Sequence, residues 1–209
     1  MKRCVIFCAA DFHGLIAPLE EDDYVIAADG GLAHTQALGI TPHCILGDFD
    51  SLGYTPTGST VFPVEKDDTD AMLAVRQGLA MGCKEFYLYG SLDGKRLDHT
   101  VANFQTLQFL SDHGAYGYLI GKDYLVTALK DGALSFNADC TGIFSVFCMG
   151  RDAAGVCIRG AKYEAENAQL CAGFPLGVSN HFEGKEVTVS VGDGSLLILW
   201  DTSNGFPNR

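Results

Sequence analysis

The sequence has no long hydrophobic run and little positive charge. No apolar stretch approaches the roughly 20 residues that a membrane-spanning helix needs, so we expect no membrane partner. Lysine and arginine together number 14 against 26 aspartate and glutamate residues, which gives a formal net charge of −12. Because binding to a phosphate backbone requires a basic face, this balance argues against a nucleic-acid partner.

The signals of secretion and of zinc binding are also missing. The first ten residues combine a positive start with an apolar run, but that run is short and breaks at Asp11 without a cleavage-type ending, so it predicts a strand rather than a signal peptide. The eight cysteines include no C-x-x-C pair, and most lie within apolar runs. This usage favours reduced, buried thiols in a cytoplasmic protein over zinc ligands or disulfides.

The first half of the chain alternates apolar strands with helix-like segments. Strands are expected at 4–9, 24–28, 44–46, 60–64, 85–89 and 116–120, and helices at 32–38, 68–81 and 97–113. Such alternation predicts an α/β domain with a mainly parallel sheet and helices on both faces. We expect this domain to cover residues 1–123.

The second half contains short strands separated by glycine turns. They are expected at 125–129, 133–136, 143–149, 156–158, 186–191 and 195–200, and no long helical period appears between them. The pattern predicts an all-β domain over residues 124–209, with Trp200 in its core and a frayed tail from Thr202 to Arg209.

Acidic residues follow several strands of the predicted parallel sheet, where ligands bind beyond the carboxyl ends. Several carboxylates at one rim remain ionised only if a cation lies among them. Asp48 and Asp50 flank Phe49, which is expected to pack inward, and Asp70 opens a helix. We interpret these three carboxylates as a Mg²⁺ site. The alternative for Asp48 and Asp50 is an Asp-rich turn that bonds its own backbone. In the 67–70 segment, ordinary helix capping explains one or two of the carboxylates, and we expect Asp67 or Asp68 to be the cap.

Two further segments at the same edge point to phosphate. Gly30 and Gly31 lead into a helix, so their N–H groups can meet a phosphate, although a tight turn with Asp29 as its cap is the simpler reading. Arg96 can hold phosphate oxygens with two parallel hydrogen bonds, and Asp98 can bind metal or a hydroxyl. The alternative is a surface Arg–Asp pair. A histidine at a helix start, here His99, is more often structural than catalytic.

In the all-β half, a glycine turn presents Ser179 and Asn180, which can hydrogen-bond a heteroaromatic ring on which Tyr163 stacks. Taken alone, these residues are more often turn formers.

Together, and in this order, the motifs closely resemble the thiamine pyrophosphokinase family over nearly the whole chain. The segments that carry the resemblance are Asp29-Gly30-Gly31, Gly47-Asp48-Phe49-Asp50-Ser51, Lys66-Asp67-Asp68-Thr69-Asp70, Gly94-Lys95-Arg96-Leu97-Asp98-His99 with Asn103, then Tyr163 and Gly177-Val178-Ser179-Asn180. One departure is Lys95, which stands where the family often has another glycine. A lysine at this position can add a phosphate contact or stiffen the loop.

The resemblance implies an α/β ATP-binding domain, a β-sandwich domain that helps to hold thiamine, Mg²⁺ dependence, and a homodimer with active sites between subunits. The implied reaction is in-line attack of the thiamine hydroxyethyl oxygen on the β-phosphorus of ATP, with AMP leaving. Catalytic roles fall on Asp48, Asp50, Asp70, Arg96 and Asp98, of which the first three are the metal ligands. Nucleotide or phosphate contacts fall on Asp29, Gly30, Gly31, Lys66, Asp67, Thr69, Arg96, His99 and Asn103, and thiamine contacts on Tyr163, Ser179 and Asn180.

Three other functions remain open at this point. A related pyrophosphokinase acting on another hydroxyalkyl heterocycle, such as a pterin, would keep the acidic residues and change the contacts of the β domain. A haloacid-dehalogenase-like phosphatase needs a nucleophilic aspartate at the end of the first strand, where this chain has Ala9 and Ala10 before Asp11. A nucleotide sensor without catalysis would have the fold without the full set of carboxylates.

Overall fold

The structure is a computed structural model that describes residues 2–49, 52–65 and 67–209. The chain divides into two compact units, Met1–Lys122 and Asp123–Arg209, called unit 1 and unit 2 below. Each has its own buried apolar core. No helix in the described part of the chain is long and apolar enough to cross a membrane.

Unit 1 is built on a parallel sheet. Its strands lie in the order β6-β5-β1-β2-β3-β4, and every pair of neighbours is parallel. Their bounds are β1 (Arg3–Phe7), β2 (Tyr24–Ala28), β3 (Cys44–Gly47), β4 (Thr60–Val61), β5 (Glu85–Tyr89) and β6 (Tyr116–Ile120). Strand β1 is buried along its whole length, as expected for a parallel strand covered on both faces.

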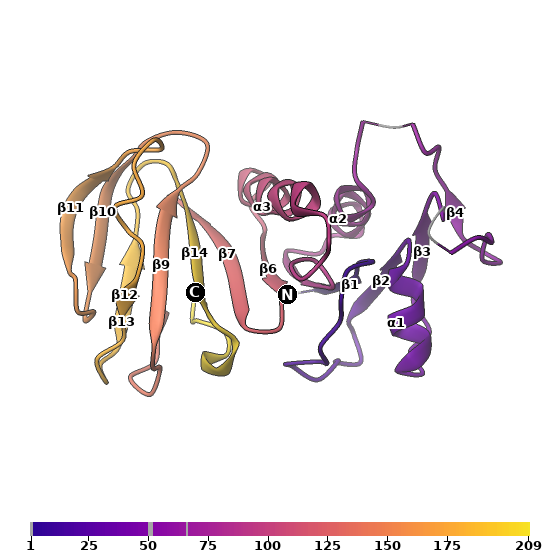
Figure 1. Cartoon of the computed structure of the whole chain (residues 1–209), viewed down its shortest axis with the longest axis horizontal. Helices are drawn as coiled ribbons and strands as arrows, with labels where there is room; N and C mark the ends of the chain where they lie inside the picture. Colours follow the sequence, from indigo (N-terminus) through magenta and orange to yellow (C-terminus); the bar gives the residue numbers. More distant parts are fainter. Residues whose placement is uncertain (1, 50–51, 66) are drawn as a thin grey trace. The chain divides into compact units, whose positions relative to one another are not determined.

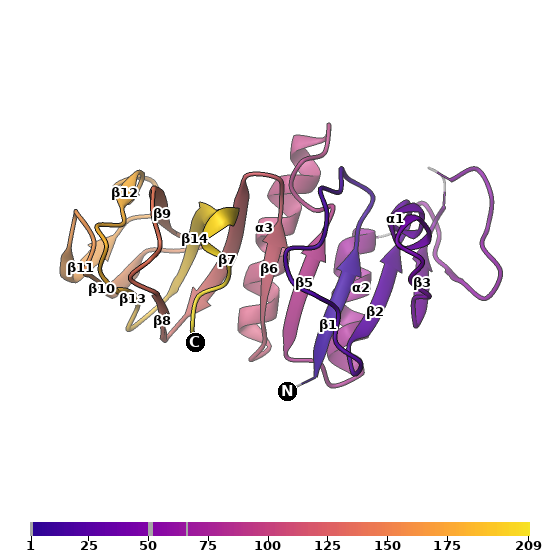
Figure 2. The ribbon, with the colours of Figure 1, turned by 90° about the horizontal axis from the view of Figure 1, so that it is seen from below.

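Three helices cover this sheet. Helices α2 (Asp70–Ala80) and α3 (Leu97–Asp112) lie against one face, and α1 (Gly31–Ala37) lies against the other (Figures 1 and 2). The predicted α/β arrangement of this half is therefore confirmed. The strand expected at 60–64 is shorter than predicted, because only Thr60 and Val61 pair with β3.

Unit 2 contains two antiparallel sheets. One has the order β12-β9-β14-β7 and the other β11-β10-β13-β8. The first sheet comprises β7 (Tyr124–Lys130), β9 (Ile143–Cys148), β12 (Asn180–His181) and β14 (Ser195–Asp201). The second comprises β8 (Ala133–Phe136), β10 (Ala153–Arg159), β11 (Ala165–Leu170) and β13 (Val187–Ser190).

Aromatic side chains join the two sheets of unit 2. The ring of Phe136 on β8 lies 6.1 Å from that of Phe144 on β9 and 5.2 Å from that of Trp200 on β14, centroid to centroid. Trp200 is fully buried, as predicted. Side chains from facing sheets that fill a shared core define a sandwich, so the predicted β-sandwich is confirmed.

Three expectations for unit 2 and the cysteines are wrong. Strand β11 was not predicted, because three residues of its sequence Ala-Glu-Asn-Ala-Gln-Leu are polar and no apolar run marks it. The strand forms by pairing with β10. The tail is not frayed, because Trp200 Nε1 donates to the Gly205 carbonyl at 2.8 Å and Asn208 N donates to the Ser135 carbonyl at 2.8 Å. Cys171 is exposed rather than buried.

Candidate active site

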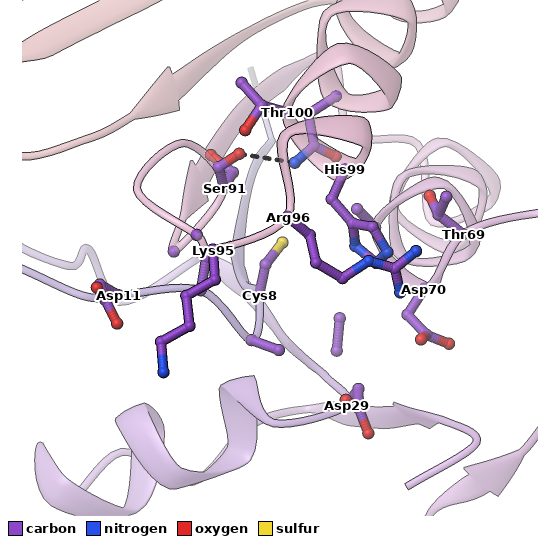
Figure 3. A pocket seen from close by; sticks show the side chains of 17 residues that line it. Cys8, Asp11, Asp29, Thr69, Asp70, Ser91, Lys95, Arg96, His99 and Thr100 are labelled. Carbon is purple, nitrogen blue, oxygen red and sulfur yellow. Dashed lines mark hydrogen bonds between the residues drawn. The ribbon is translucent and has the colours of Figure 1, made fainter. Parts of the chain in front are cut away.

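A pocket of about 480 Å³ lies in unit 1 at the carboxyl ends of its central strands. The segments that line it follow β1, β2 and β5 or open helices α2 and α3 (Figure 3). Its lining residues are Cys8, Ala9, Ala10, Asp11, Ala28, Asp29, Thr69, Asp70, Ala71, Gly90, Ser91, Gly94, Lys95, Arg96, His99, Thr100 and Asn103. This is the edge at which an open parallel sheet binds its ligands.

Two carboxylates at this edge are partly withdrawn from solvent. Asp29 is buried and Asp70 is half-buried, and the Oδ1 atoms of both lie beneath the surface. Asp29 has φ of +48°, and its N–H donates to the Leu46 carbonyl at 2.8 Å, which ties the end of β2 to β3. Burial, followed by the charge of Asp70, raises the pKa of the Cys8 thiol to about 12. The thiol beside the carboxylate is therefore neutral near pH 7.

The start of α2 assigns different roles to neighbouring residues. Thr69 caps the helix, since its hydroxyl accepts the Met72 N–H at 3.2 Å. The expectation that Asp67 or Asp68 is the cap is therefore wrong. Asp68 instead accepts a 2.9 Å hydrogen bond from Arg76 Nε, and Asp67 is exposed and does not line the pocket.

The predicted Mg²⁺ ligands are only partly described. Phe49 packs inward as expected, with 3% exposure, and its φ is +59°. Asp48 beside it is half-buried at the end of β3 and is not among the residues that line the pocket. Asp50 and Lys66 lie outside the described residues. The assignment of Asp48, Asp50 and Asp70 to metal thus stays a prediction.

Another acidic group lies at the opposite edge of the sheet. Oxygen atoms of Glu20, Asp22 and Asp23, just before β2, lie within 4.8 Å of one another. Asp23 is buried and accepts hydrogen bonds from Arg3 at 2.6 and 2.5 Å. Because a buried carboxylate beside a guanidinium is already compensated, we read this group as structural.

The glycine pair before α1 is explained by packing. A Cβ on Gly31 would lie 1.9 Å from the Phe7 carbonyl oxygen, so only glycine allows α1 to approach β1 this closely. Gly30, and not Asp29, is the N-terminal cap of α1. Neither glycine lines the pocket, in contrast to Asp29.

Arg96 and His99 reach the pocket from the loop after β5. Arg96 donates to both carboxylate oxygens of Asp98, at 3.2 and 2.6 Å, and the two side chains are 67% and 65% exposed. Hydrogen bonding from Arg96 lowers the pKa of Asp98. Asp98 is not among the lining residues, whereas Figure 3 shows Arg96 beside His99 on the side of the pocket where Asp70 lies. The Arg–Asp surface pair is thus present, and Arg96 still faces the pocket.

Asn103 fixes the loop that carries Arg96. It is buried on α3, and its Nδ2 donates to the Ser91 carbonyl at 2.7 Å, which Figure 3 draws as a dashed line. This bond joins the loop after β5 to the helix that follows it.

In unit 2, the three residues that were predicted to contact thiamine differ in burial and in hydrogen bonding. Asn180 is buried, and its Oδ1 accepts the N–H groups of Tyr163 at 3.0 Å and His181 at 2.8 Å, while its Nδ2 donates to the Tyr163 carbonyl at 2.7 Å. Most of its hydrogen-bonding capacity is therefore used by the backbone. Ser179 is exposed with φ of +58°, and its N–H donates to Ser145 Oγ. The Tyr163 ring is 58% exposed.

Sequence reasoning missed several residues that line the pocket. Asp11 follows β1 at the same edge as the predicted carboxylates, so the rule that selected them would have found it. Lys95, named in the sequence analysis as a departure but not assigned to the site, lines the pocket as well. Cys8 gave none, since it reads as one more apolar position of a buried strand.

Comparisons with known proteins agree with these two units. The family model for the thiamin pyrophosphokinase catalytic domain matches residues 17–116, and that for the thiamin pyrophosphokinase vitamin B1 binding domain matches residues 134–196. A thiamine pyrophosphokinase of Bacillus subtilis is 26% identical over 192 residues, which cover 88% of this chain and 89% of the relative.

Solved structures share the fold. The crystal structure of thiamine pyrophosphokinase from Bacillus subtilis aligns with a TM-score of 0.80 at 23% identity, over 95% of this chain and 98% of that one. Thiamin pyrophosphokinase from Geobacillus thermodenitrificans aligns with a TM-score of 0.77 at 22% identity, over 98% and 100%. The enzyme from Candida albicans aligns with a TM-score of 0.73 at 15% identity, over 96% and 88%.

Proposed function

Because the chain belongs to the thiamine pyrophosphokinase family, we propose that it transfers pyrophosphate from ATP to the hydroxyethyl group of thiamine, giving thiamine diphosphate and AMP. The observation that carries the proposal is the pocket of unit 1, where Asp70, Arg96 and His99 meet at the carboxyl edge of the sheet. These three residues fall within the segment that matches the catalytic family model.

We assign the ATP polyphosphate to this pocket. Arg96 binds phosphate oxygens there once it exchanges its contact with Asp98 for the nucleotide, since a planar guanidinium matches two phosphate oxygens as well as two carboxylate oxygens. Asn103, through its bond to the Ser91 carbonyl, keeps the loop of Arg96 in place. The proposal keeps Asp29, Gly30, Gly31, Lys66, Asp67, Thr69 and His99 as residues of the nucleotide site, with Gly30 and Gly31 acting through the backbone.

The oxygen donors at this edge suit Mg²⁺. Asp29 and Asp70 each place a carboxylate oxygen beneath the surface, and Mg²⁺ prefers one or two carboxylates together with substrate phosphates. We propose that Asp70, with Asp48 and Asp50, holds the ion. When bound, Mg²⁺ neutralises charge on the phosphates that move.

The remaining task of the protein is to position the two substrates for the transfer. Transfers of this kind depend on holding the attacking oxygen in line with the phosphorus, and no strong base is required. Asp98, released when Arg96 turns to phosphate, is a candidate for orienting the thiamine hydroxyl. An exposed aspartate is ionised near pH 7, so the released carboxylate accepts a hydrogen bond from that hydroxyl.

We propose that unit 2 holds thiamine through the exposed ring of Tyr163 and the hydroxyl of Ser179. Asn180 supports this surface by fixing the backbone of Tyr163. The match of residues 134–196 to the vitamin B1 binding model supports the assignment.

We also propose that the enzyme is a cytoplasmic homodimer. Phe174, Leu176 and Val178 in unit 2 are each more than half exposed, and clustered apolar side chains of this size favour an interface between copies. The eight free cysteines are typical of a reducing compartment. Light scattering on the purified protein checks the dimer, and a monomer at micromolar concentration would contradict it.

The proposed reaction is tested by its products. The protein is incubated with ATP, Mg²⁺ and thiamine, and the nucleotides are separated by chromatography. We expect AMP and thiamine diphosphate in equal amounts, with neither formed when thiamine is omitted. Formation of ADP and thiamine monophosphate, or of inorganic phosphate without thiamine, would overturn the proposal, as would transfer to a hydroxymethyl pterin in preference to thiamine.

A further inference from the structure

Lys95 is a cation at the rim of the unit 1 pocket that the proposed function does not use. We propose that Lys95 binds the polyphosphate of ATP directly, on the side of the pocket opposite to Asp70. The inference rests on the proposed function and deepens it, because it adds a residue that sets the affinity for the nucleotide.

The backbone beneath Lys95 is held in place. A Cβ on the preceding Gly94 would lie 3.1 Å from the Ala10 Cβ, so the two loops are already in close contact there. Ala10 in turn donates its N–H to the Gly90 carbonyl at 3.0 Å and accepts a 2.9 Å hydrogen bond at its carbonyl from His34 Nε2 in the tautomer that protonates this nitrogen. The Lys95 side chain therefore extends from a fixed point at the rim of the pocket.

Lys95 also differs from Arg96 in its partners. Arg96 is engaged by Asp98, at 2.6 Å between Nη2 and Oδ2. Lys95 is exposed, and within the described ranges no carboxylate lies at ion-pair distance from it. An anion that enters the pocket can thus meet the Lys95 ammonium without displacing a carboxylate, whereas it must compete with Asp98 for Arg96.

The two cations serve different parts of the pocket. In Figure 3 the Arg96 side chain extends toward the side where Asp70 lies, and the Lys95 side chain extends away from it, on the side of Asp11. A triphosphate carries negative charge along its whole length, so cations on two sides of one pocket can bind different phosphates of the same chain. Asp11 lines the same pocket, and its charge repels an anion there unless a cation offsets it.

The chemistry of lysine fixes the kind of effect to expect. Its ammonium is a compact charge on a flexible stem, and it makes similar contacts with the ground state and with the transition state of a phosphate chain. Loss of such a contact weakens binding and leaves the rate at saturation nearly unchanged. One lost charge-assisted hydrogen bond at a solvent-exposed rim lowers affinity by about 5- to 10-fold.

The test measures binding by titration calorimetry, without thiamine, so that no turnover occurs. The ligands are ATP with MgCl₂ and inorganic tripolyphosphate with MgCl₂. The variants are Lys95→Gln, Lys95→Arg and, as the matched control, Lys84→Gln, which removes the same charge at the opposite edge of the sheet, where Lys84 Nζ donates to the His113 carbonyl. We expect Lys95→Gln to weaken both ligands by about 5- to 10-fold, Lys95→Arg to retain most of the affinity, and Lys84→Gln to match the parent.

Three results would overturn the inference. They are affinity of Lys95→Gln within twofold of the parent for both ligands, a loss for ATP that is absent for tripolyphosphate, and an equal loss in Lys84→Gln. The proposed function fails separately, if the parent protein makes no AMP from ATP and thiamine. In that case a loss of tripolyphosphate affinity in Lys95→Gln still supports Lys95 as a phosphate-binding residue.

Discussion

The segment Gly94–His99 in unit 1 and the segment Gly177–His181 in unit 2 look alike in sequence, since each begins with glycine and continues into polar side chains. Their side chains have different environments. Lys95, Arg96 and His99 face a pocket of about 480 Å³. Asn180 is buried, and its amide bonds three backbone groups. A glycine followed by polar residues therefore indicates a loop. Whether the hydrogen-bonding groups of that loop remain available to a ligand depends on the surrounding backbone.

The largest expected effect comes from removing the charge of Asp70, which tests whether the unit 1 pocket is the catalytic site. We expect Asp70→Asn to lower pyrophosphate transfer by at least about 1,000-fold, because it removes a hard oxygen ligand and transition-state charge compensation together. The fold should persist, since Thr69 and not Asp70 caps α2. AMP formation at saturating Mg²⁺ is the readout, with circular dichroism as the check on folding.

Asp22→Asn is the matched control for Asp70→Asn. It removes the same charge from the acidic group before β2, at the opposite edge of the sheet. We expect activity within twofold of the parent. Retained activity in Asp70→Asn together with loss in Asp22→Asn would move the metal site to the other edge and refute the account of unit 1.

Replacement of Arg96 by lysine tests whether geometry matters in addition to charge. A lysine cannot reproduce two parallel hydrogen bonds to phosphate, so Arg96→Lys should cost about 2–4 kcal/mol in the transition state, roughly a 30- to 1,000-fold loss of kcat/KM. Steady-state kinetics with ATP as the varied substrate provides the measurement. A kcat/KM within about twofold of the parent would mean that Arg96 only pairs with Asp98 and does not bind phosphate.

The glycines of the two units provide a comparison in stability. A Cβ on Gly31 would lie 1.9 Å from the Phe7 carbonyl oxygen, and one on Gly177 would lie 1.9 Å from the Val146 carbonyl oxygen. We expect Gly31→Ala and Gly177→Ala each to lower the free energy of unfolding by about 3 kcal/mol. Gly173→Ala, where a Cβ meets nothing within 4 Å, is the control and should change it by less than about 0.5 kcal/mol. Chemical denaturation measures all three, and equal stabilities would show that the backbone relaxes at both sites.

The smallest expected effect belongs to Asn180. Asn180→Ala leaves the N–H groups of Tyr163 and His181 without the amide oxygen, which costs about 1–3 kcal/mol of stability. Because the backbone of Tyr163 then loses its anchor, the KM for thiamine should rise by roughly tenfold, while the KM for ATP hardly changes.

Ser179→Ala is the companion variant for Asn180→Ala. Ser179 is exposed and its bond to Ser145 uses the backbone N–H, so this change should leave the melting temperature unaltered. Equal increases in both KM values for Asn180→Ala would mean that the segment supports the whole enzyme rather than the acceptor. An unchanged thiamine KM would remove Tyr163 from the acceptor surface.

Much of the fold could be predicted because it depends on local patterns. Apolar strands alternating with helices indicated the parallel sheet of unit 1, and short strands separated by glycine turns indicated the all-β unit 2. Strand β11 was missed because half of its residues are polar and no apolar run marks it, and its pairing with β10 is a tertiary effect. The tail was misjudged for the same reason, since the bonds of Asn208 to Ser135 join residues far apart in the sequence.

The site was predictable where chemistry follows strand ends. Asp29, Asp70 and Arg96 were selected because parallel strands bring their carboxyl ends to one edge, and these residues do line one pocket. The sequence left open whether Arg96 pairs with Asp98 at the surface, as it does. It also did not show that Thr69, rather than Asp67 or Asp68, caps α2. Such choices depend on which of several nearby partners lies at hydrogen-bond distance, and spacing alone does not determine that.

The most direct test of the central claim is a crystal structure with thiamine, Mg²⁺ and an ATP analogue in which a methylene group replaces the oxygen between the α- and β-phosphorus, so that transfer is blocked. The account predicts the polyphosphate in the unit 1 pocket, the metal on Asp70, phosphate oxygens on Arg96 and Lys95, and the thiamine hydroxyl in line with the β-phosphorus. A nucleotide bound away from this pocket, or a metal held by Glu20, Asp22 and Asp23 instead, would contradict it.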